Sequence, residues 1–422
     1  MGRPAVIALF VLSLLPSAYL AWQGRDLPHL GSFHDDAIYL ETARNLACEN
    51  TYKIGSLPWA PAQTKYPPLY PLYLSIAWRI TPDLDKALPI AMFLNWLWLP
   101  IWVIGIHRLL KPSRLHPWLK LALPLLIAVH PDVQLASIRI MSDLMCAALI
   151  TWSLATRNPF LAALTYLVRS AALPLIAALA ITDLYAKRWR SAATGLAIAA
   201  VPIVGWAIWV AANRHHGTTS IERYYTDYIA YQLEMIPISG IPGHMYQQLD
   251  PLINSISRLL LLNSGWVILE RLAAFAAISG VIRLMRSGQM QAYGVYGLLM
   301  TTMMLIWYFP LDNRALLPAL PLIWLGFTEE LRCFMEILKA AWSKRPAERA
   351  FAAIFATICA TLPLAMLYNA TANLSKVGEP LLRSERQLFK NTRAAFRWIE
   401  ANTTKQTHFY TVDDPVFALY TN

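Results

Sequence analysis

Two adjacent aspartates, Asp35 and Asp36, are the strongest candidates in this sequence for catalytic groups. They stand at the start of residues 36–48, where apolar residues recur at helical spacing, so both carboxylates lie at a helix N-terminus. One explanation is structural, because an aspartate in that position caps the helix and interacts favourably with its dipole. A cap needs only one carboxylate, however, and two can divide the work: one accepts a proton while the other orients a substrate or a metal. The sequence leaves both explanations open.

Two basic residues, Lys65 and Arg314, could bind an anionic group. Lys65 precedes Tyr66 and two prolines, and the prolines restrict the backbone that holds its ammonium group. Arg314 lies in a short turn between two long apolar runs, and its planar guanidinium suits phosphate oxygens. For both residues the alternative is contact with lipid headgroups, because long basic side chains extend to the membrane interface.

His34 adjoins the two aspartates, and an imidazole together with carboxylates can bind zinc or manganese. Adjacent residues seldom complete one coordination sphere, so His34 with Asp35 is a weak candidate for a divalent metal site, and no cofactor is certain. The four cysteines show no CxxC spacing, so they indicate neither a zinc site nor a disulfide framework.

The elements that position these residues are predicted to be membrane helices. Hydrophobic residues make up 57% of the 422 residues and charged residues only 14%, against about 25% charged in an ordinary soluble domain. Apolar runs of about 15 to 24 residues recur along the chain, a length that spans a bilayer. We therefore predict an all-α polytopic membrane protein with about eleven transmembrane helices. The predicted helices cover residues 5–22, 88–110, 119–137, 143–156, 160–185 (two short helices meeting near Arg169), 193–212, 267–284, 293–309, 315–331 and 351–368.

Charge distribution predicts how the chain is oriented. Lys and Arg exceed Asp and Glu by eleven, and they cluster in alternate short loops near residues 108–120, 187–190, 283–286 and 339–349. This is the positive-inside pattern, so these loops face the cytoplasm and nucleic-acid binding is excluded. The loop of residues 23–87, with a helix at the membrane surface, and that of residues 213–257 then face outward. Residues 1–368 form the transmembrane domain, and the polar residues 369–422 form a short soluble tail on the outer side, with a helix over residues 385–401.

Several segments resemble motifs of one family in the expected order. The segment SFHDDAIYLETARNLA resembles the first-loop acid motif of the C-type (GT-C) glycosyltransferases. The segment KYPPLYPLYLSIAWRI resembles the Lys-Tyr-Pro-Pro stretch of the same family. Three further segments resemble its second-loop acid, its helix break and its Arg-Tyr-Leu-Leu-Pro segment: SIRIMSDLMCAALI, YLVRSAALPLIAALA and DNRALLPALPLIW. The C-terminal AAFRWIEANTTKQTHFYTVDDPVFALYTN resembles the start of the family's periplasmic tail. The family includes the protein O-mannosyltransferases and the lipid A aminoarabinose transferase.

The resemblance implies a function. Such enzymes move a sugar from a polyprenyl-phosphate donor to a lipid, glycan or protein acceptor at the outer face of the membrane, with inversion. Asp35 would deprotonate or position the acceptor, and Asp36 stands where many relatives have glutamate. Lys65 and Arg314 would bind the donor phosphate and stabilise the leaving group.

The resemblance also implies roles for neighbouring residues and a location. Asp143 matches the second-loop acid and would orient the acceptor, although it could instead cap its helix; Tyr66 and Arg44 are further orienting candidates. The location implied is a bacterial inner membrane, with the active site on its periplasmic face and membrane lipids around it.

The sequence departs from the family pattern in places. No proline follows Arg169, and Ala315 replaces a common aromatic residue. Two other functions remain alternatives. A lipid-linked glycan ligase or polymerase would concentrate basic residues in a late outer loop, whereas here the first loop is the richest in polar residues. A secondary transporter would show two inverted halves with interrupted helices, and the sequence shows no such repeat.

Overall fold

The computed structural model describes residues 3–57, 59–113, 115–215, 219–262, 265–288, 290–342, 350, 353, 379–404, 407, 409, 411 and 414–421. Within these residues the chain is all-α, apart from one antiparallel bridge between Lys53 and Ala62. The predicted all-α class is thus confirmed. The span predicted for residues 351–368 lies almost entirely outside the described residues.

Three helices in the described part of the chain are long and apolar enough to cross a membrane: α1 (Arg3–Gln23), α4 (Leu84–Leu110) and α10 (Trp189–Asn213). A fourth span is possible where α5 (Pro117–Ala128) and α6 (Pro131–Ser137) follow one another with a bend of 54°. The bend falls at Pro131, which cannot continue a helical hydrogen-bond ladder. The sequence predicted one helix over residues 119–137 and missed this break.

Shorter apolar helices complete the bundle. The helix predicted over residues 143–156 is α7 (Asp143–Thr156), and the predicted break near Arg169 separates α8 (Pro159–Val168) from α9 (Leu173–Tyr185), with the single 3₁₀ turn η1 (Ser170–Ala172) between them. The remaining predicted spans correspond to α14 (Val267–Arg286), α15 (Gln291–Ile306) and α16 (Leu320–Trp342), the last preceded by the 3₁₀ segment η3 (Asn313–Ala319).

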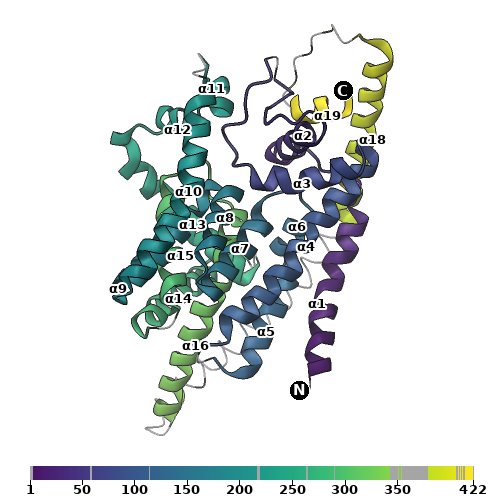
Figure 1. Cartoon of the computed structure of the whole chain (residues 1–422). Helices are drawn as coiled ribbons and strands as arrows, with labels where there is room; N and C mark the ends of the chain where they lie inside the picture. The colour runs from purple at the N-terminus through teal and green to yellow at the C-terminus, as the bar shows by residue number, and fades with distance from the viewer. Residues whose placement is uncertain are drawn as a thin grey trace.

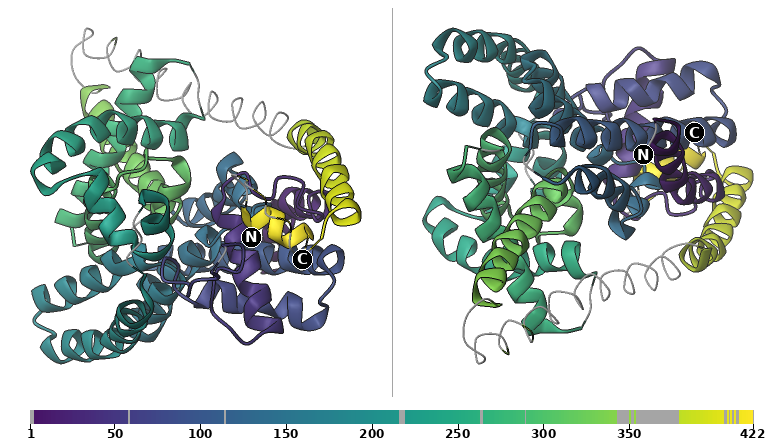
Figure 2. Two further views of the ribbon diagram at one scale, coloured as in Figure 1. Left: turned by 90° about the horizontal axis from the view of Figure 1, so that it is seen from above. Right: turned by 90° about the horizontal axis from the view of Figure 1, so that it is seen from below.

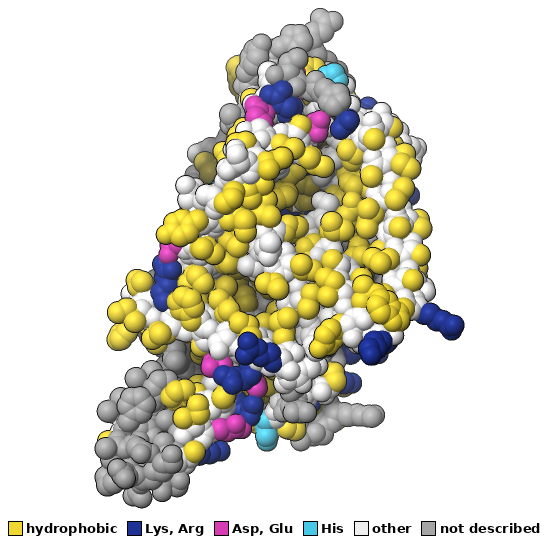
Figure 3. All heavy atoms as spheres, turned by 90° about the vertical axis from the view of Figure 1, so that its left-hand side faces the viewer, with side chains coloured by type: hydrophobic (Ala, Val, Ile, Leu, Met, Phe, Trp, Pro, Cys, Tyr) yellow, Lys and Arg dark blue, Asp and Glu magenta, His cyan; other side chains and the backbone are white. Residues whose placement is uncertain are grey.

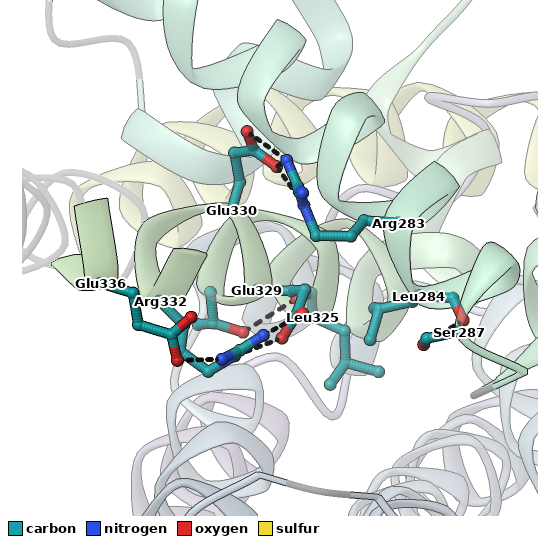
Figure 4. A network of polar contacts seen from close by, with 9 residues as sticks. Arg283, Leu284, Ser287, Leu325, Glu329, Glu330, Arg332 and Glu336 are labelled. Atoms are coloured by element: carbon teal, nitrogen blue, oxygen red, sulfur yellow. Dashed lines mark hydrogen bonds and ion pairs between the residues drawn. The ribbon is translucent and has the colours of Figure 1, made fainter. Parts of the chain in front are cut away.

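Helices α14 and α16 pack closely because glycines face each other. A Cβ atom added at Gly280 would lie 1.8 Å from the backbone oxygen of Gly326, so neither position has room for a side chain. Nearby, the guanidinium of Arg283 on α14 donates hydrogen bonds of 3.2 Å to Glu330 on α16 (Figure 4). The same figure shows Arg332 bound to Glu329 and Glu336 along one side of α16. Such exposed ion pairs contribute little to stability, so the glycine contact is the main constraint.

The second predicted outer loop is largely helical. It contains α11 (Ser220–Thr226), α12 (Tyr228–Met235), the short η2 (Ile238–Gly240) and α13 (Ile241–Leu261). Hydropathy alone misses α13 because polar residues interrupt its apolar run. Its buried residues Leu252, Ile256 and Leu259 nevertheless recur at helical spacing.

The residues of the first loop gather at one end of the molecule. Figure 1 shows α2 (Asp35–Cys48) and α3 (Leu69–Ile80) at the end where α1 finishes, opposite the N-terminus. The C-terminal helices α18 (Glu379–Asn402) and α19 (Asp414–Thr421) reach the same end, and the view from above in Figure 2 shows α19 over the first-loop segments. The tail, which was predicted as a short soluble piece, thus packs onto α1 and α2. The side chain of Leu382 lies next to Gly24, and the side chain of Val416 lies next to Gly31.

One side of the molecule has the surface expected of a membrane protein. In Figure 3, hydrophobic side chains cover the middle of the face, while charged side chains gather toward its two ends. Helix α10 carries several of the exposed hydrophobic residues of the chain, among them Val201, with 74% of its surface exposed. The sequence-based expectation of a polytopic membrane protein agrees with these features.

Candidate active site

The two aspartates have different environments at the start of α2. His34 precedes the helix with a φ of 60°, and its side chain makes no capping hydrogen bond. The carboxylate of Asp36 accepts hydrogen bonds from the backbone N–H groups of Ala37 (2.8 Å) and Gly31 (3.1 Å), and it is fully buried. Burial raises the pKa of Asp36 to about 7; the two backbone hydrogen bonds oppose this shift, and the charge of Asp35 adds to it. Asp36 therefore takes the capping role.

Asp35 faces side chains of the loop before α3. Its carboxylate accepts a short hydrogen bond from the hydroxyl of Tyr66, and its Oδ1 lies 3.7 Å from the Nζ of Lys65. The Asp35 side chain is 22% exposed. A carboxylate that is partly open to solvent and paired with a cation can receive a proton from an incoming group.

Lys65 is enclosed by aromatic rings and does not extend into solvent. Its side chain is 6% exposed, and Nζ lies 3.4, 4.9 and 5.2 Å from the ring centres of Tyr224, Tyr66 and Tyr228. Ring faces attract a cation and replace part of its lost hydration. Burial lowers the pKa of Lys65 to about 8, although the charge of Asp35 opposes this effect. The lipid-headgroup explanation for Lys65 does not fit this enclosed position.

A second cluster forms around Asp143, the first residue of α7. Its carboxylate, 3% exposed, accepts a short hydrogen bond from Arg169 at the α8–α9 break and lies 3.8 Å from the Nε of Arg314 in η3. Asp143 Oδ2 and Arg314 Nη1 are both buried without a hydrogen-bond partner. Buried polar atoms are normally satisfied, so this cluster retains capacity for a polar ligand.

Arg139 joins the second cluster through an aromatic ring. The guanidiniums of Arg139 and Arg314 lie 4.4 and 4.8 Å from the ring centre of Phe33, which stands just before His34 and Asp35. Burial lowers the pKa of Arg139, and the positive charge of Arg314 also contributes. Both arginines therefore contact the same ring.

The two clusters are connected. The ring of Tyr39 on α2 lies 4.7 Å from the ring of Tyr66, centre to centre, and its hydroxyl is 3.1 Å from the hydroxyl of Ser142, which precedes Asp143. The lysine–aspartate pair and the arginine–aspartate cluster are thus separated by one buried side chain. Together they place two carboxylates and several cations at the end of the bundle where α2 and α3 lie.

The fold has counterparts among solved structures. It is similar to ArnT from Cupriavidus metallidurans bound to undecaprenyl phosphate, with a TM-score of 0.60, 14% identity, and coverage of 100% of this chain and 85% of that one. It is also similar to the Archaeoglobus fulgidus oligosaccharyltransferase in the apo form (TM-score 0.55, 14% identity, 100% of this chain and 60% of that one). The complex of that enzyme with Zn and sulfate gives a TM-score of 0.54 at 16% identity, over 98% of this chain and 57% of that one.

The chain has the fold of the C-type polytopic glycosyltransferases. At these identities the similarity is one of fold, and it agrees with the resemblance seen in the sequence motifs. No protein-family model and no curated protein matches the sequence.

Within this C-type fold, most of the sequence-predicted site residues come together. Asp35, Lys65 and Tyr66 form one cluster, and Asp143 and Arg314 form the other. Arg44 does not belong to either cluster. It follows Asp35 by nine residues, which is about two and a half helical turns, so it lies on the other side of α2. There it donates a hydrogen bond to the carbonyl of Ala418 in α19.

Sequence reasoning missed three groups of residues in the C-type fold. Arg139 lies between α6 and α7, in what was predicted as the tip of a helix hairpin, and the tyrosines of α11 and α12 lie in what was predicted as a loop. Asp414 belongs to the tail, and it accepts a hydrogen bond of 3.2 Å from Tyr225. No local signal links these residues to Asp35. The ring Nε2 of His34 lies 2.5 Å from the hydroxyl of Tyr225.

Proposed function

We propose that the chain is an integral membrane glycosyltransferase that moves a sugar from a polyprenyl-phosphate donor to a lipid, glycan or protein acceptor, with inversion at the anomeric carbon. The observation that carries this proposal is the pair formed by the buried Lys65 and the partly exposed Asp35, beside the Asp143–arginine cluster. This set offers cations for a phosphate and a carboxylate for a proton at one end of a membrane bundle. The ArnT structure holds undecaprenyl phosphate, and a structure of the archaeal enzyme AglB holds a dolichol-phosphate with an inhibitory peptide, which supports a donor of this class.

Lys65 and Arg314 bind the donor phosphate in this proposal, and Arg139 contributes a third positive charge. Arg314 Nη1 is buried without a hydrogen-bond partner, so a phosphate oxygen could supply the missing acceptor. As the bond between the sugar and the phosphate breaks, negative charge grows on the leaving group. Fixed cations in a poorly hydrated site stabilise that charge more than water would.

Asp35 is the proposed general base. The hydroxyl or amine of the acceptor attacks the anomeric carbon from the face opposite the phosphate, and its proton passes to the Asp35 carboxylate. The bond between the anomeric carbon and the phosphate oxygen breaks, and polyprenyl phosphate leaves with the electron pair. Tyr66 holds Asp35 through its hydroxyl. Asp36 is buried behind the site, so we assign it a positioning role, and Asp143 orients the arginines and the acceptor.

A divalent metal does not fit these residues well. One related structure contains Zn, but here Asp35 faces Lys65, and Asp143 faces Arg169 and Arg314, so an added cation would meet existing positive charge. No group of three or more His, Cys, Asp or Glu side chains suited to a metal occurs in the described part of the chain. His34 is within hydrogen-bond distance of Tyr225. The proposed transfer therefore uses protein side chains alone.

The proposed location is a bacterial inner membrane, with residues 1–368 as the transmembrane domain, about eleven spans, and the active site on the periplasmic side. A reporter fused after Lys111 should be cytoplasmic, and one fused after Ser56 should be external, because basic residues favour the cytoplasmic loops. An external reporter at Lys111 would put Asp35 on the wrong side of the membrane for this function.

Transfer can be tested directly with the purified protein in liposomes. Radiolabelled undecaprenyl-phosphate mannose, glucose and 4-amino-arabinose are offered one at a time, with membrane vesicles as the source of lipid, glycan and protein acceptors. Transfer of label that requires Asp35 is the expected result. Binding of undecaprenyl phosphate without transfer from any donor would contradict the proposal. Polymerisation of lipid-linked glycan would favour a ligase or polymerase, and movement of the intact donor across the bilayer would favour a transporter.

A further inference from the structure

Two short helices of the second outer loop, α11 and α12, form a hairpin beside Lys65. They lie at the end of the molecule where α2 and α3 lie (Figure 1). The guanidinium of Arg223 on α11 donates hydrogen bonds of 2.9 and 3.1 Å to the carboxylate of Glu234 on α12. The hydroxyl of Thr64 donates a hydrogen bond of 2.9 Å to the carbonyl of Thr226 at the end of α11. The hairpin is thus attached to the segment that carries Lys65.

Aromatic rings pack along this hairpin. The ring centre of Tyr224 lies 5.3 Å from that of Tyr231, with the ring planes at 77°. Tyr231 lies 6.3 Å from Phe309, with the planes at 24°. Such edge-to-face and stacked contacts favour defined ring orientations. Tyr231 remains partly exposed, so part of its ring is open to a ligand.

The rings of the hairpin line an open cavity of about 520 Å³. This volume falls within the range of about 300–1,000 Å³ that is typical of small-ligand sites. The lining includes Tyr224, Tyr225 and Tyr231, together with the hydroxyl-bearing Ser220. None of the described residues that line it is Lys, Arg, Asp or Glu. The described lining therefore offers ring faces and hydroxyl groups, and no carboxylate, ammonium or guanidinium.

The cavity lies between the proposed base and the proposed phosphate site. His34, the residue before Asp35, lines it. Lys65 does not line it, although its ammonium lies 3.4 Å from the ring centre of Tyr224, which does. The Tyr224 ring therefore separates the ammonium from the cavity. A donor sugar, bonded directly to the phosphate, stays on the Lys65 side of this ring, whereas a second substrate can approach Asp35 from the cavity.

The lining indicates the chemical class of that second substrate. A phosphate or a charged peptide would find no counter-charge among the described residues of the lining, and a fatty acyl chain would offer no partner to its hydroxyl groups. A sugar ring fits both features. Its C–H groups carry partial positive charge, which the negative face of an aromatic ring attracts, and its hydroxyls can pair with those of tyrosine and serine.

We propose that the cavity binds a sugar residue of the acceptor, stacked on Tyr231, so that the acceptor is a glycan. This inference rests on the proposed function. A hydroxyl of the bound sugar attacks the anomeric carbon of the donor, and its proton passes to Asp35. A glycosidic bond between two sugars forms, and polyprenyl phosphate leaves with the electron pair of the broken bond.

The first test compares two variants of Tyr231, with undecaprenyl-phosphate sugar as donor and membrane vesicles as acceptor source. Tyr231→Leu removes the ring and should raise the apparent KM for the vesicles about 2- to 10-fold, as expected for one aromatic contact. Its KM for the donor should stay within about twofold, because Lys65 and Arg314 are untouched. Tyr231→Phe keeps the ring and should stay within about twofold of the wild-type protein for both substrates.

A matched control and a second variant exclude an effect on folding. Tyr246, on α13, is 78% exposed, and Tyr246→Leu should leave both KM values unchanged. Ile221 lines the cavity and is 71% exposed, so Ile221→Arg narrows the cavity without removing a ring. It should raise the KM for the vesicles and leave that for the donor unchanged. Thermal unfolding shows whether each variant is folded.

The second test identifies the product of the wild-type protein and needs no variant. Methylation linkage analysis should show the radiolabelled sugar bonded to another sugar. The label should stay with a glycan after protease digestion, and it should survive mild acid that cleaves sugar phosphates.

The outcomes separate this inference from the proposed function. Label on a protein side chain or on a lipid phosphate would overturn the inference and leave the glycosyltransferase proposal standing. An unchanged KM for the vesicles in folded Tyr231→Leu and Ile221→Arg would do the same. So would a rise confined to the KM for the donor, which would place the donor sugar in the cavity. Absence of transfer by the wild-type protein from every donor would overturn both proposals.

Discussion

The buried ammonium of Lys65 should make donor binding depend on pH in a range where an ordinary lysine keeps its charge. Burial lowers the pKa of Lys65 from 10.5 to about 8, against the opposing charge of Asp35 at 3.7 Å. Because the pKa is depressed, the positive charge is present below about pH 8 and is lost as the pH rises through that value. The affinity for undecaprenyl phosphate should therefore fall between about pH 7 and pH 10.

The size of the effect follows from one charge-assisted hydrogen bond. Its loss costs about 1.5–3 kcal/mol, which corresponds to a Kd about 10- to 150-fold higher. Above the pKa of the free protein the affinity should decrease about tenfold per pH unit, and it should level off once Lys65 is neutral in the complex as well. The ligand does not contribute to this slope, because the second pKa of a phosphate monoester is about 6.

Binding can be followed by the tryptophan fluorescence of the protein in nanodiscs at a series of pH values. Lys65→Met should bind with the weak affinity of the high-pH wild-type protein at every pH. Lys65→Arg should show no decrease over this range, because a guanidinium keeps its charge. In Asp35→Asn the midpoint should move below about 8, since the carboxylate that raises the pKa is gone. A wild-type midpoint near that of an ordinary lysine, or the same decrease in Lys65→Met, would refute the assignment of Lys65 to the donor phosphate.

The other predictions concern catalysis and packing. Asp35→Asn should reduce transfer by roughly 10²–10⁴-fold, while Asp36 still supplies the cap; near-normal transfer by this variant would contradict the assignment of Asp35 as the base. Asp143→Asn should destabilise the protein by on the order of 2 kcal/mol, because it leaves two partly exposed arginines without a counter-charge; an unchanged unfolding temperature would contradict this. Gly280→Val should lower the unfolding temperature sharply, because a Cβ atom there meets the backbone of α16. Gly205→Ala should not, because a Cβ atom there has no neighbour within 4 Å. Thermal unfolding followed by circular dichroism compares the two variants.

Much of the fold follows from local patterns in the sequence. The predicted helix over residues 143–156 coincides with α7, because the spacing of its apolar residues is a local signal. The predicted break near Arg169 is also present, because a charged residue interrupts an apolar run there. The start of a helix at Asp35 follows from the same kind of signal. The 54° bend was missed although Pro131 is a local signal for it, and α13 was missed because polar residues interrupt its apolar run.

Composition and short-range spacing are enough to predict the membrane class, most of the apolar helices and the presence of acids and cations in the segments between them. The different surroundings of the two carboxylates depend on the folded structure: Asp36 turns back to the backbone, whereas Asp35 lies next to Lys65. Folding also brings His34 to Tyr225, 191 residues away, and Tyr225 to Asp414 in the tail. Such pairings arise when helices pack, and packing depends on the shape and burial of whole surfaces, which local spacing does not encode.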